Sequence, residues 1–195
     1  MIILIAFGVL FFIGAIPTAY LAGKALQGKD IRQFGSGNVG ATNAFRVLGK
    51  KAGVFVFFID FLKGFVPIFF AARFFSSGHP YFIELGFGPI LGHIFTPFLN
   101  FKGGKGVATS LGVIAFIFPQ IFIIAILVWG VIFIITRIVS ISSLFSIGSI
   151  LFSAALLHKD EEEFFFLGIL FCLLLWTHRE NIKRLITGSE SRFSK

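Results

Sequence analysis

Residues 35–46, with the sequence GSGNVGATNAFR, combine residue types that suit the binding of a phosphate group. Glycines allow backbone conformations that side chains hinder, so neighbouring N–H groups can converge on one anion. Arg46 adds a planar guanidinium whose donors match phosphate oxygens. The short neutral donors of this stretch are Ser36, Asn38, Thr42 and Asn43. The sequence therefore predicts a phosphate-binding loop that includes Gly37 and Gly40.

A second glycine-rich stretch, NFKGGKG, covers residues 100–106 and precedes an apolar run. A glycine-rich turn that leads into a helix presents N–H groups at the positive end of the helix dipole. The spacing is not that of a Walker A loop, because Leu99 and Gly106 stand at its glycine and hydroxyl positions. The alternative is that its lysines are ordinary loop charges. The candidate anion-binding residues are Lys102, Gly103, Gly104, Lys105, Gly106 and Thr109.

Ionisable residues also occur inside the apolar runs. Asp60 and Lys63 are three residues apart, so they share one face of a helix. Ionisable groups at membrane depth are costly, and they are usually functional or paired. A purely structural ion pair is the alternative here. His93 lies near the end of another apolar run, where both catalysis and simple packing are possible roles.

The C-terminal tail carries a third polar motif, HRENIKRL, over residues 178–185. His178 and Asn181 are three residues apart and share a helical face, which favours a functional role for this pair. Arg184 follows as a further candidate for substrate binding. Contact with lipid headgroups is the alternative for the other basic residues of the tail.

The composition defines a membrane protein. Of the 195 residues, 56% are hydrophobic and 13% are charged, whereas soluble domains have about 45–50% and about 25%. The mean hydropathy is +0.95. The net charge of +8 does not indicate nucleic-acid binding, because the basic residues fall in short loops between apolar runs. The lone Cys172 excludes a disulfide framework within the chain.

We expect an all-α bundle of seven transmembrane helices in a single domain, residues 1–195, with the N-terminus outside and the C-terminus cytoplasmic. Division of residues 107–136 into two spans places almost every Lys and Arg on the cytoplasmic face, with Arg73 and Lys159 as exceptions. One long helix there would place the basic tail outside.

The acidic run 158–163 is expected as an outer loop, and residues 76–80 as a turn. The motif loops are expected at about residues 24–52, 100–106 and 178–195. The expected spans are residues 2–21, 53–75, 81–99 (interrupted), 107–118, 121–136, 141–157 and 164–177.

Together these motifs resemble the signatures of the acyl-phosphate:glycerol-3-phosphate acyltransferases. Residues 36–46 with Asp60, Lys63 and Gly64 are similar to the first signature, and residues 92–109 to the second. Residues 178–185 with Gly188 and Glu190 are similar to the third. The resemblance covers nearly the whole chain, with the motifs in order.

The resemblance implies an enzyme of the bacterial inner membrane whose active site faces the cytoplasm. It would transfer an acyl group from acyl phosphate to the 1-hydroxyl of sn-glycerol 3-phosphate, the first acylation of phospholipid synthesis. The expected partners are these two substrates and membrane lipid, without nucleic acid, cofactor or metal, and the protein is expected to be a monomer. The predicted catalytic residues are Ser36, Arg46, Lys105, His178 and Asn181, and the other motif residues named above are predicted to bind substrate.

Two other functions are compatible with parts of this pattern. An organic-phosphate transporter should show inverted repeats and polar residues near the membrane midplane, but the sequence has no repeat. A non-catalytic lipid-binding subunit would not need three polar loops. For the enzyme, neither His93 nor His178 has a carboxylate nearby in sequence to orient it. A substrate phosphate, with a second pKa of about 6, is therefore the favoured proton acceptor, and direct catalysis by a histidine is the rival.

The scattered carboxylates predict catalysis without a metal ion. A Mg²⁺ site usually gathers carboxylates, whereas those on the predicted cytoplasmic face are far apart in sequence: Asp30, Asp60, Glu180 and Glu190. Release of phosphate from acyl phosphate in the presence of glycerol 3-phosphate should therefore continue in excess EDTA. Loss of activity that added Mg²⁺ restores would contradict this prediction.

Overall fold

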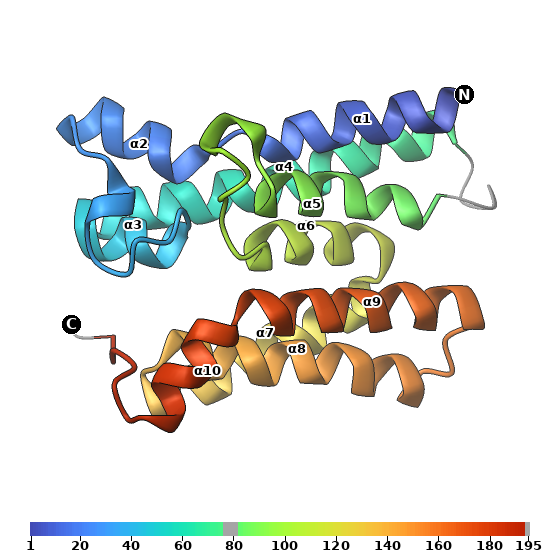
Figure 1. The fold of residues 1–195 in the computed structure, drawn as a ribbon. Helices are drawn as coiled ribbons and strands as arrows, with labels where there is room; N and C mark the ends of the chain where they lie inside the picture. Colours follow the sequence, from blue (N-terminus) through green and yellow to red (C-terminus); the bar gives the residue numbers. More distant parts are fainter. Residues whose placement is uncertain (76–81, 194–195) are drawn as a thin grey trace. The chain divides into compact units, whose positions relative to one another are not determined.

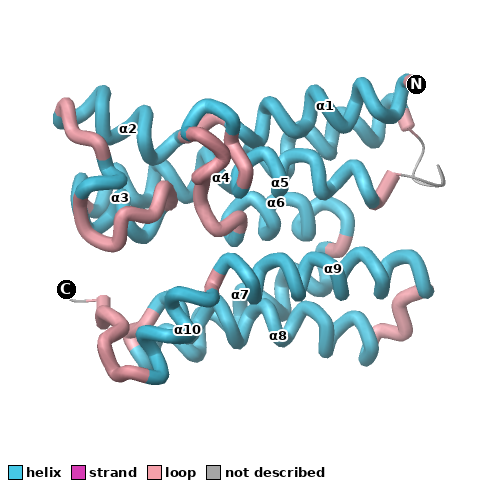
Figure 2. Tube along the Cα trace, viewed as in Figure 1, coloured by secondary structure: helices cyan, strands magenta, loops and turns pink. Residues whose placement is uncertain are grey.

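Figure 1 shows the computed structural model of the chain, which describes residues 1–75 and 82–193. Within these residues every secondary-structure element is a helix, as Figure 2 shows. The turn predicted at residues 76–80 lies outside the described residues. The chain forms two compact units, Met1–Ile117 and Phe118–Lys195, and each is described by itself.

Over its described residues, the first unit contains six α-helices, which pair through closely packed small residues. α1 packs against α5, and α4 packs against both α3 and α6. A Cβ atom on Gly64 would meet the backbone of Thr109, and one on Gly92 would meet the backbone of Phe11. Glycine at such positions lets two helix backbones approach closely within a membrane. The helices of this unit are α1 (Ile2–Ala15), α2 (Thr18–Gln27), α3 (Ala41–Leu48), α4 (Lys50–Phe74), α5 (Phe87–Ile94) and α6 (Val107–Ile117).

The first predicted span, residues 2–21, is broken in the structure. α1 ends at Ala15 and α2 begins at Thr18, with Pro17 between them. Proline has no N–H to donate and its ring disrupts the preceding helical turn, so it ends α1. At the break the carbonyl of Ile16 accepts from the N–H of Thr18 at 3.0 Å, and the carbonyls of Ala15 and Ile16 also accept from side chains of the candidate site.

The second unit contains α7 (Pro119–Thr136), α8 (Val139–Leu156), α9 (Glu161–Thr177) and α10 (Arg179–Ile186). α8 packs against α7 and α9, and its serines bond to α7: Ser146 Oγ donates to the carbonyl of Ala125 at 2.9 Å. The acidic run predicted as a loop instead enters α9, whose first turn holds Glu161–Glu163. Asp160 caps this helix, and negative side chains favour a helix N-terminus, which explains the difference.

The structure is that of a polytopic helical membrane protein. Four helical segments of the described residues are long and apolar enough to cross a membrane, or five if α9 and α10, bent by 56°, are taken as one. α5 and α6 contain 8 and 11 residues, so they extend only about 12 and 17 Å, well short of a bilayer core of about 30 Å. The predicted division of residues 107–136 into two helices is confirmed, because α6 ends at Ile117 and α7 begins at Pro119.

Candidate functional site

The first motif loop is held in shape by Asn43, whose side chain is fully buried at the start of α3. Its Nδ2 atom donates to the carbonyls of Ile31 and Phe34, both at 3.1 Å. Its Oδ1 atom accepts from the backbone N–H of Ser36 at 2.9 Å. Asn43 was predicted to bind substrate, but the structure gives its side chain to the backbone of the loop. The predicted loop therefore exists, and a buried amide determines its conformation.

The same loop leaves its strongest anion-binding groups at the surface. Ser36 and Arg46 are exposed, and Asn38 and Thr42 are half-buried. Among the described residues, no carboxylate forms an ion pair with Arg46. Gly37, with a φ of 70°, takes a left-handed conformation that favours glycine. An exposed guanidinium in the last turn of α3, the helix that follows the glycine turn, suits an incoming phosphate.

Asp30, the carboxylate that precedes the first motif loop, forms an ion pair with Arg32 and not with Arg46. Asp30 pairs with Arg32 at 2.7 Å and also caps the short helix Ile31–Gln33. The hydrogen bond from the Arg32 side chain lowers the pKa of Asp30 to about 2, so this carboxylate stays charged at neutral pH. Its charge is matched within the loop by Arg32, which leaves the guanidinium of Arg46 for a ligand.

The second motif loop is docked onto the end of α5 by its glycines. The N–H of Gly103 donates to the carbonyl of Ile94 at 3.0 Å, and that of Gly104 to the carbonyl of His93 at 3.1 Å. A Cβ atom on Gly103 would meet the His93 carbonyl, and one on Gly104 would meet the His93 imidazole. These two amides were predicted to bind phosphate, but the structure uses them to hold the loop. Glycine is required here because the loop lies directly on His93.

The second motif loop carries two lysines and leads into the N-terminus of α6. Lys102 is exposed and Lys105 is partly exposed. Gly106, with a φ of 83°, sets the turn into α6, whose N-terminus follows at Val107. Lys105 therefore lies two residues before the positive end of a helix dipole, as predicted. Thr109, a predicted substrate-binding residue, is instead fully buried in α6.

Asp60 and Lys63 form an ion pair at 2.9 Å inside the first unit. Both are buried, with 1% and 7% of their surface exposed, so substrate does not reach them from solution. Lys63 Nζ also donates to the carbonyl of Ile16 at 2.9 Å, one of the two carbonyls freed by the break after α1. His93 is buried beside the pair, with its Nδ1 atom 3.8 Å from Asp60 Oδ1. The prediction that these residues share a helix face is confirmed, and their immediate contacts are structural.

Thr96, which sequence reasoning did not single out, completes this arrangement. Its Oγ1 atom donates to the carbonyl of Ala15 at 2.6 Å. A cavity of about 10 Å³, the room of one water molecule, lies among Thr18, Lys63, His93, Gly103 and Gly104. Buried polar side chains thus connect the break after α1 to the segment that carries the second motif loop. The sequence offers one signal for this role of Thr96: it is a hydroxyl residue directly before Pro97, and no residue next to it in the sequence is an evident hydrogen-bond partner.

In the second unit, the third motif is organised by Glu190. Its Oε1 atom accepts from Asn181 Nδ2 at 2.7 Å and from Ser140 Oγ at 2.8 Å. Its Oε2 atom accepts from Arg184 Nε at 2.6 Å. The predicted tail residues Asn181 and Arg184 therefore share one buried carboxylate, which also ties α10 to the start of α8. The sequence signal for this role is a lone acid after Gly188 in a basic tail.

His178 is oriented by the end of α9. It is 2% exposed, and its Nδ1 atom lies 2.8 Å from the carbonyl of Leu174. Because a carbonyl only accepts, Nδ1 carries the proton of this hydrogen bond, and Nε2 is the acceptor nitrogen of the neutral ring. His178 is the residue before α10, at the 56° bend from α9, and Asn181 lies in the first turn of α10.

The fold is that of a helical membrane protein, and its glycine-rich, basic motif loops are typical of an integral membrane enzyme that acts on phosphate compounds. Comparison with known proteins identifies the family. Residues 3–188 match the family model described as glycerol-3-phosphate acyltransferase. The chain is 42% identical over 183 residues to the glycerol-3-phosphate acyltransferases of Fusobacterium nucleatum and Aquifex aeolicus. These alignments cover 94% of this chain and 94% and 95% of those proteins. The chain belongs to the glycerol-3-phosphate acyltransferase family.

Solved structures agree with this assignment. The glycerol 3-phosphate form of PlsY (YgiH), an integral membrane glycerol 3-phosphate acyltransferase, superposes with a TM-score of 0.90 at 38% identity. Its lysophosphatidic acid form superposes with a TM-score of 0.91 at 40% identity. Both comparisons cover 100% of this chain and 96% of the solved one. The predicted resemblance and the predicted acyltransferase activity are confirmed.

The buried carboxylate of Glu190 predicts a pH-dependent stability. Burial raises its pKa, but hydrogen bonds from Arg184, Ser140 and Asn181 outweigh that effect and lower the pKa below its ordinary value of 4.5. A group with a lowered pKa stabilises the fold above its unfolded pKa, and this contribution is lost as the pH falls through the folded pKa. The thermal unfolding midpoint in detergent should therefore fall as the pH drops below 4.5. The variant Glu190→Gln should unfold at a lower temperature near pH 7 and should show a flatter pH dependence.

The matched control is Glu180→Gln, which removes an exposed carboxylate that pairs with Lys183. Exposed pairs contribute little, so this variant should follow the wild-type pH dependence. An unchanged acid dependence in Glu190→Gln would contradict the role given to Glu190.

Proposed function

We propose that this enzyme takes its acyl group from acyl phosphate and transfers it to the 1-hydroxyl of sn-glycerol 3-phosphate. The hydroxyl oxygen bonds to the acyl carbon, the bond from that carbon to the phosphate oxygen breaks, and phosphate leaves. The product is 1-acyl-sn-glycerol 3-phosphate. The observation that carries the proposal is the exposed Arg46 in the last turn of α3, without a carboxylate partner in the described chain, after a loop whose backbone Asn43 bonds. Both substrates carry phosphate, which accounts for several anion-binding groups.

The proposed roles follow from charge, residue type and position in the three motifs. Arg46 and Lys105 bind phosphate and stabilise the negative charge that develops on the acyl oxygen. Ser36, His178 and Asn181 bind and orient glycerol 3-phosphate. The substrate loops are completed by Gly37, Asn38, Gly40, Thr42, Lys102, Gly103, Gly104, Gly106 and Arg184. The buried members of the predicted set support binding through the shape of these loops: Asn43, Asp60, Lys63, His93 and Thr109.

A substrate phosphate is the proposed acceptor of the hydroxyl proton. Its second pKa of about 6 leaves it largely able to take a proton at neutral pH. His93 is a poor rival, because Gly104 lies directly against the Nε2 side of its imidazole. His178 is the stronger rival, since its hydrogen bond to Leu174 leaves Nε2 as an acceptor. No metal or cofactor is part of the proposed reaction.

The proposed setting is the bacterial inner membrane, with seven spans, the N-terminus outside, and the C-terminus and active site cytoplasmic. The sorting of Lys and Arg supports this topology. The short helices α5 and α6 would then cross only with the help of the segments that flank them. The proposed functional form is a monomer with one membrane-embedded domain over residues 1–195.

Removal of either phosphate-binding cation should abolish most activity. Loss of a charge-assisted hydrogen bond costs about 1.5–3 kcal/mol, so Arg46→Ala and Lys105→Ala should each lower kcat/KM by about 10- to 150-fold. Release of phosphate from hexadecanoyl phosphate, with and without glycerol 3-phosphate, measures this. The control Lys51→Ala removes an exposed charge at the start of α4 and should keep activity. Near wild-type kinetics in the Arg46 or Lys105 variant would remove that residue from the proposed site.

Single-turnover kinetics should separate the two proton acceptors. His93→Gln and His178→Gln are measured at saturating substrates over about pH 5 to 9. If the phosphate of a substrate accepts the proton, both variants keep the acid limb of the pH profile, because the titrating group belongs to the ligand. A histidine base predicts instead a loss of about 10²-fold or more in the chemical step and disappearance of that limb in one variant.

Cysteine labelling should test the topology. In a background with Cys172→Ser, a cysteine at Glu162 and one at Ser194, which lies outside the described residues, should react with impermeant reagent from opposite sides of the membrane. The acidic start of α9 would face outward and the basic tail would face the cytoplasm. Labelling of both positions from one side would rule out the seven-span arrangement.

A further inference from the structure

The segment after α10 returns to the corner between α7 and α8 within the second unit. It turns at Gly188, whose φ of 68° is left-handed. Further along, the backbone N–H of Phe193 donates to the carbonyl of Arg137 at 2.7 Å. Arg137 is the residue that ends α7, and it is also left-handed. We call residues 187–193 the C-terminal strap. The match to the family model ends at residue 188, so it assigns nothing to the contacts of Phe193.

Aromatic rings hold the end of the C-terminal strap. The ring of Phe193 meets the ring of Phe133 on α7 edge to face, with 5.6 Å between the ring centroids. Phe133 in turn stacks on Trp129 at 4.8 Å. The Nε1 atom of Trp129 donates to Ser143 Oγ on α8 at 3.3 Å. Because aromatic pairs stabilise beyond the burial of their surface, Phe193 ties the strap to a set of side chains that spans α7 and α8.

Glu190 attaches the same strap at a second point of the corner. It accepts from Ser140 in the first turn of α8 and from Asn181 on α10. The order along the corner is antiparallel, because Phe193 follows Glu190 in the strap whereas its acceptor Arg137 precedes Ser140. Two attachments fix the direction of the strap, whereas one would allow it to rotate about the Glu190 side chain.

The orientation of α10 depends on this strap. The helix has eight residues, follows α9 after a bend of 56°, and packs mainly on α9. A helix of this length has little stability of its own. Among its eight described residues, Asn181 alone is buried, and Glu190 of the strap is a partner of its side chain. Detachment of the strap would therefore release Asn181 together with α10.

We propose that Phe193 is a positioning residue, which keeps Glu190 seated on the α7–α8 corner and so holds Asn181 in the orientation that binds glycerol 3-phosphate. This inference rests on the role proposed above for Asn181. Phe193 acts through Glu190, and it sets the fraction of molecules in which α10 is oriented before the substrate binds. A smaller fraction of oriented molecules weakens the apparent affinity by the same factor.

Removal of the ring at the end of the strap provides the kinetic test. In Phe193→Ala the KM for glycerol 3-phosphate should rise by about 2- to 12-fold, the range that the loss of one aromatic pair allows. The kcat and the KM for hexadecanoyl phosphate should stay at their wild-type values, because saturating glycerol 3-phosphate restores the orientation. Phe193→Tyr keeps the ring and should keep the wild-type KM. The matched control Phe122→Ala removes a partly buried ring in the first turn of α7, and it should leave this KM unchanged.

A double-mutant cycle tests whether Phe193 acts through its contact with Phe133. In the Phe133→Ala background, Phe193→Ala should add little to the KM for glycerol 3-phosphate, because the pair is already lost. Effects of the two substitutions that multiply as independent changes would overturn this route.

Hydrogen exchange provides a readout that does not depend on turnover. In detergent without substrate, the amides of residues 179–193 should exchange faster in Phe193→Ala than in the wild type. Phe193→Tyr and Phe122→Ala should exchange at the wild-type rate. Unchanged exchange of α10 in Phe193→Ala, or a fall in kcat at an unchanged KM for glycerol 3-phosphate, would overturn the proposal.

The variant Asn181→Ala separates failure of this inference from failure of the proposed function. A higher KM for glycerol 3-phosphate in Asn181→Ala, without a higher KM in Phe193→Ala, would refute the positioning role of Phe193 and support the role of Asn181. An unchanged KM in Asn181→Ala would refute the proposed role of Asn181, and the positioning role of Phe193 with it. A higher KM in both variants, together with faster exchange of α10 in Phe193→Ala, is the expected result.

Discussion

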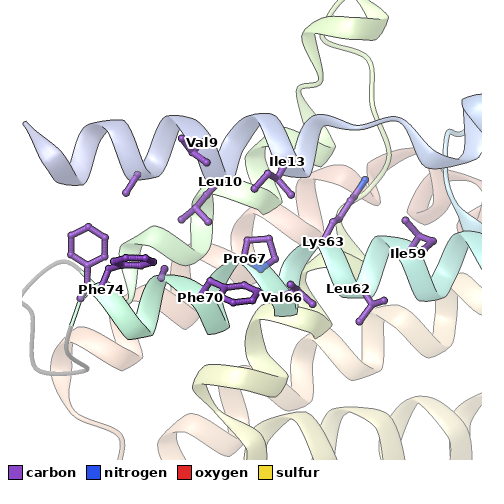
Figure 3. Close-up of a pocket in the computed structure, with 13 residues that line it drawn as sticks. Val9, Leu10, Ile13, Ile59, Leu62, Lys63, Val66, Pro67, Phe70 and Phe74 are labelled. Atoms are coloured by element: carbon purple, nitrogen blue, oxygen red, sulfur yellow. The ribbon is translucent and has the colours of Figure 1, made fainter.

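The first unit depends on how two backbone carbonyls are satisfied at the break after α1. Inside a membrane a carbonyl without a hydrogen bond is costly, because no bulk water is present to replace the partner. Pro17 ends the helix. Thr96 bonds to the carbonyl of Ala15, and the carbonyl of Ile16 accepts from both Lys63 and the N–H of Thr18. The side chain of Lys63 comes from the middle of α4, and Figure 3 shows it extending toward the end of α1, whereas that of Thr96 comes from the segment after α5. This requirement fixes α1, α4 and α5 relative to one another.

The same contacts explain why the second motif loop contains consecutive glycines. The segment that Thr96 anchors lies next to His93, and the loop returns over that histidine. Gly103 and Gly104 bond to the end of α5 at a separation that leaves no room for a Cβ atom. The lysines that flank them carry the charge. The buried part of the motif thus provides rigidity, and the exposed part provides positive charge.

The three motifs share one design, in which a buried polar side chain supports exposed or oriented donors. Asn43 holds the loop that presents Ser36. Glu190 holds Asn181 and Arg184. Each support is almost fully removed from water, where a complete set of hydrogen bonds is both strong and geometrically specific. The donors of these motifs are therefore oriented by the fold itself, and such preorganisation reduces the ordering cost of binding and reaction.

Sequence alone determined the class of protein, the motifs and the family, because hydropathy and residue spacing are local properties that need no partner. The sorting of basic residues also divided residues 107–136 close to where α6 ends and α7 begins. The tertiary structure decided which motif residues are exposed, such as Arg46, and which are buried supports, such as Asn43 and Lys63. These buried side chains donate hydrogen bonds to backbone carbonyls that are distant in the sequence. Because every residue has a backbone carbonyl, the sequence does not show which carbonyl accepts the bond. For the same reason the role of Thr96 became visible only when the chain was folded.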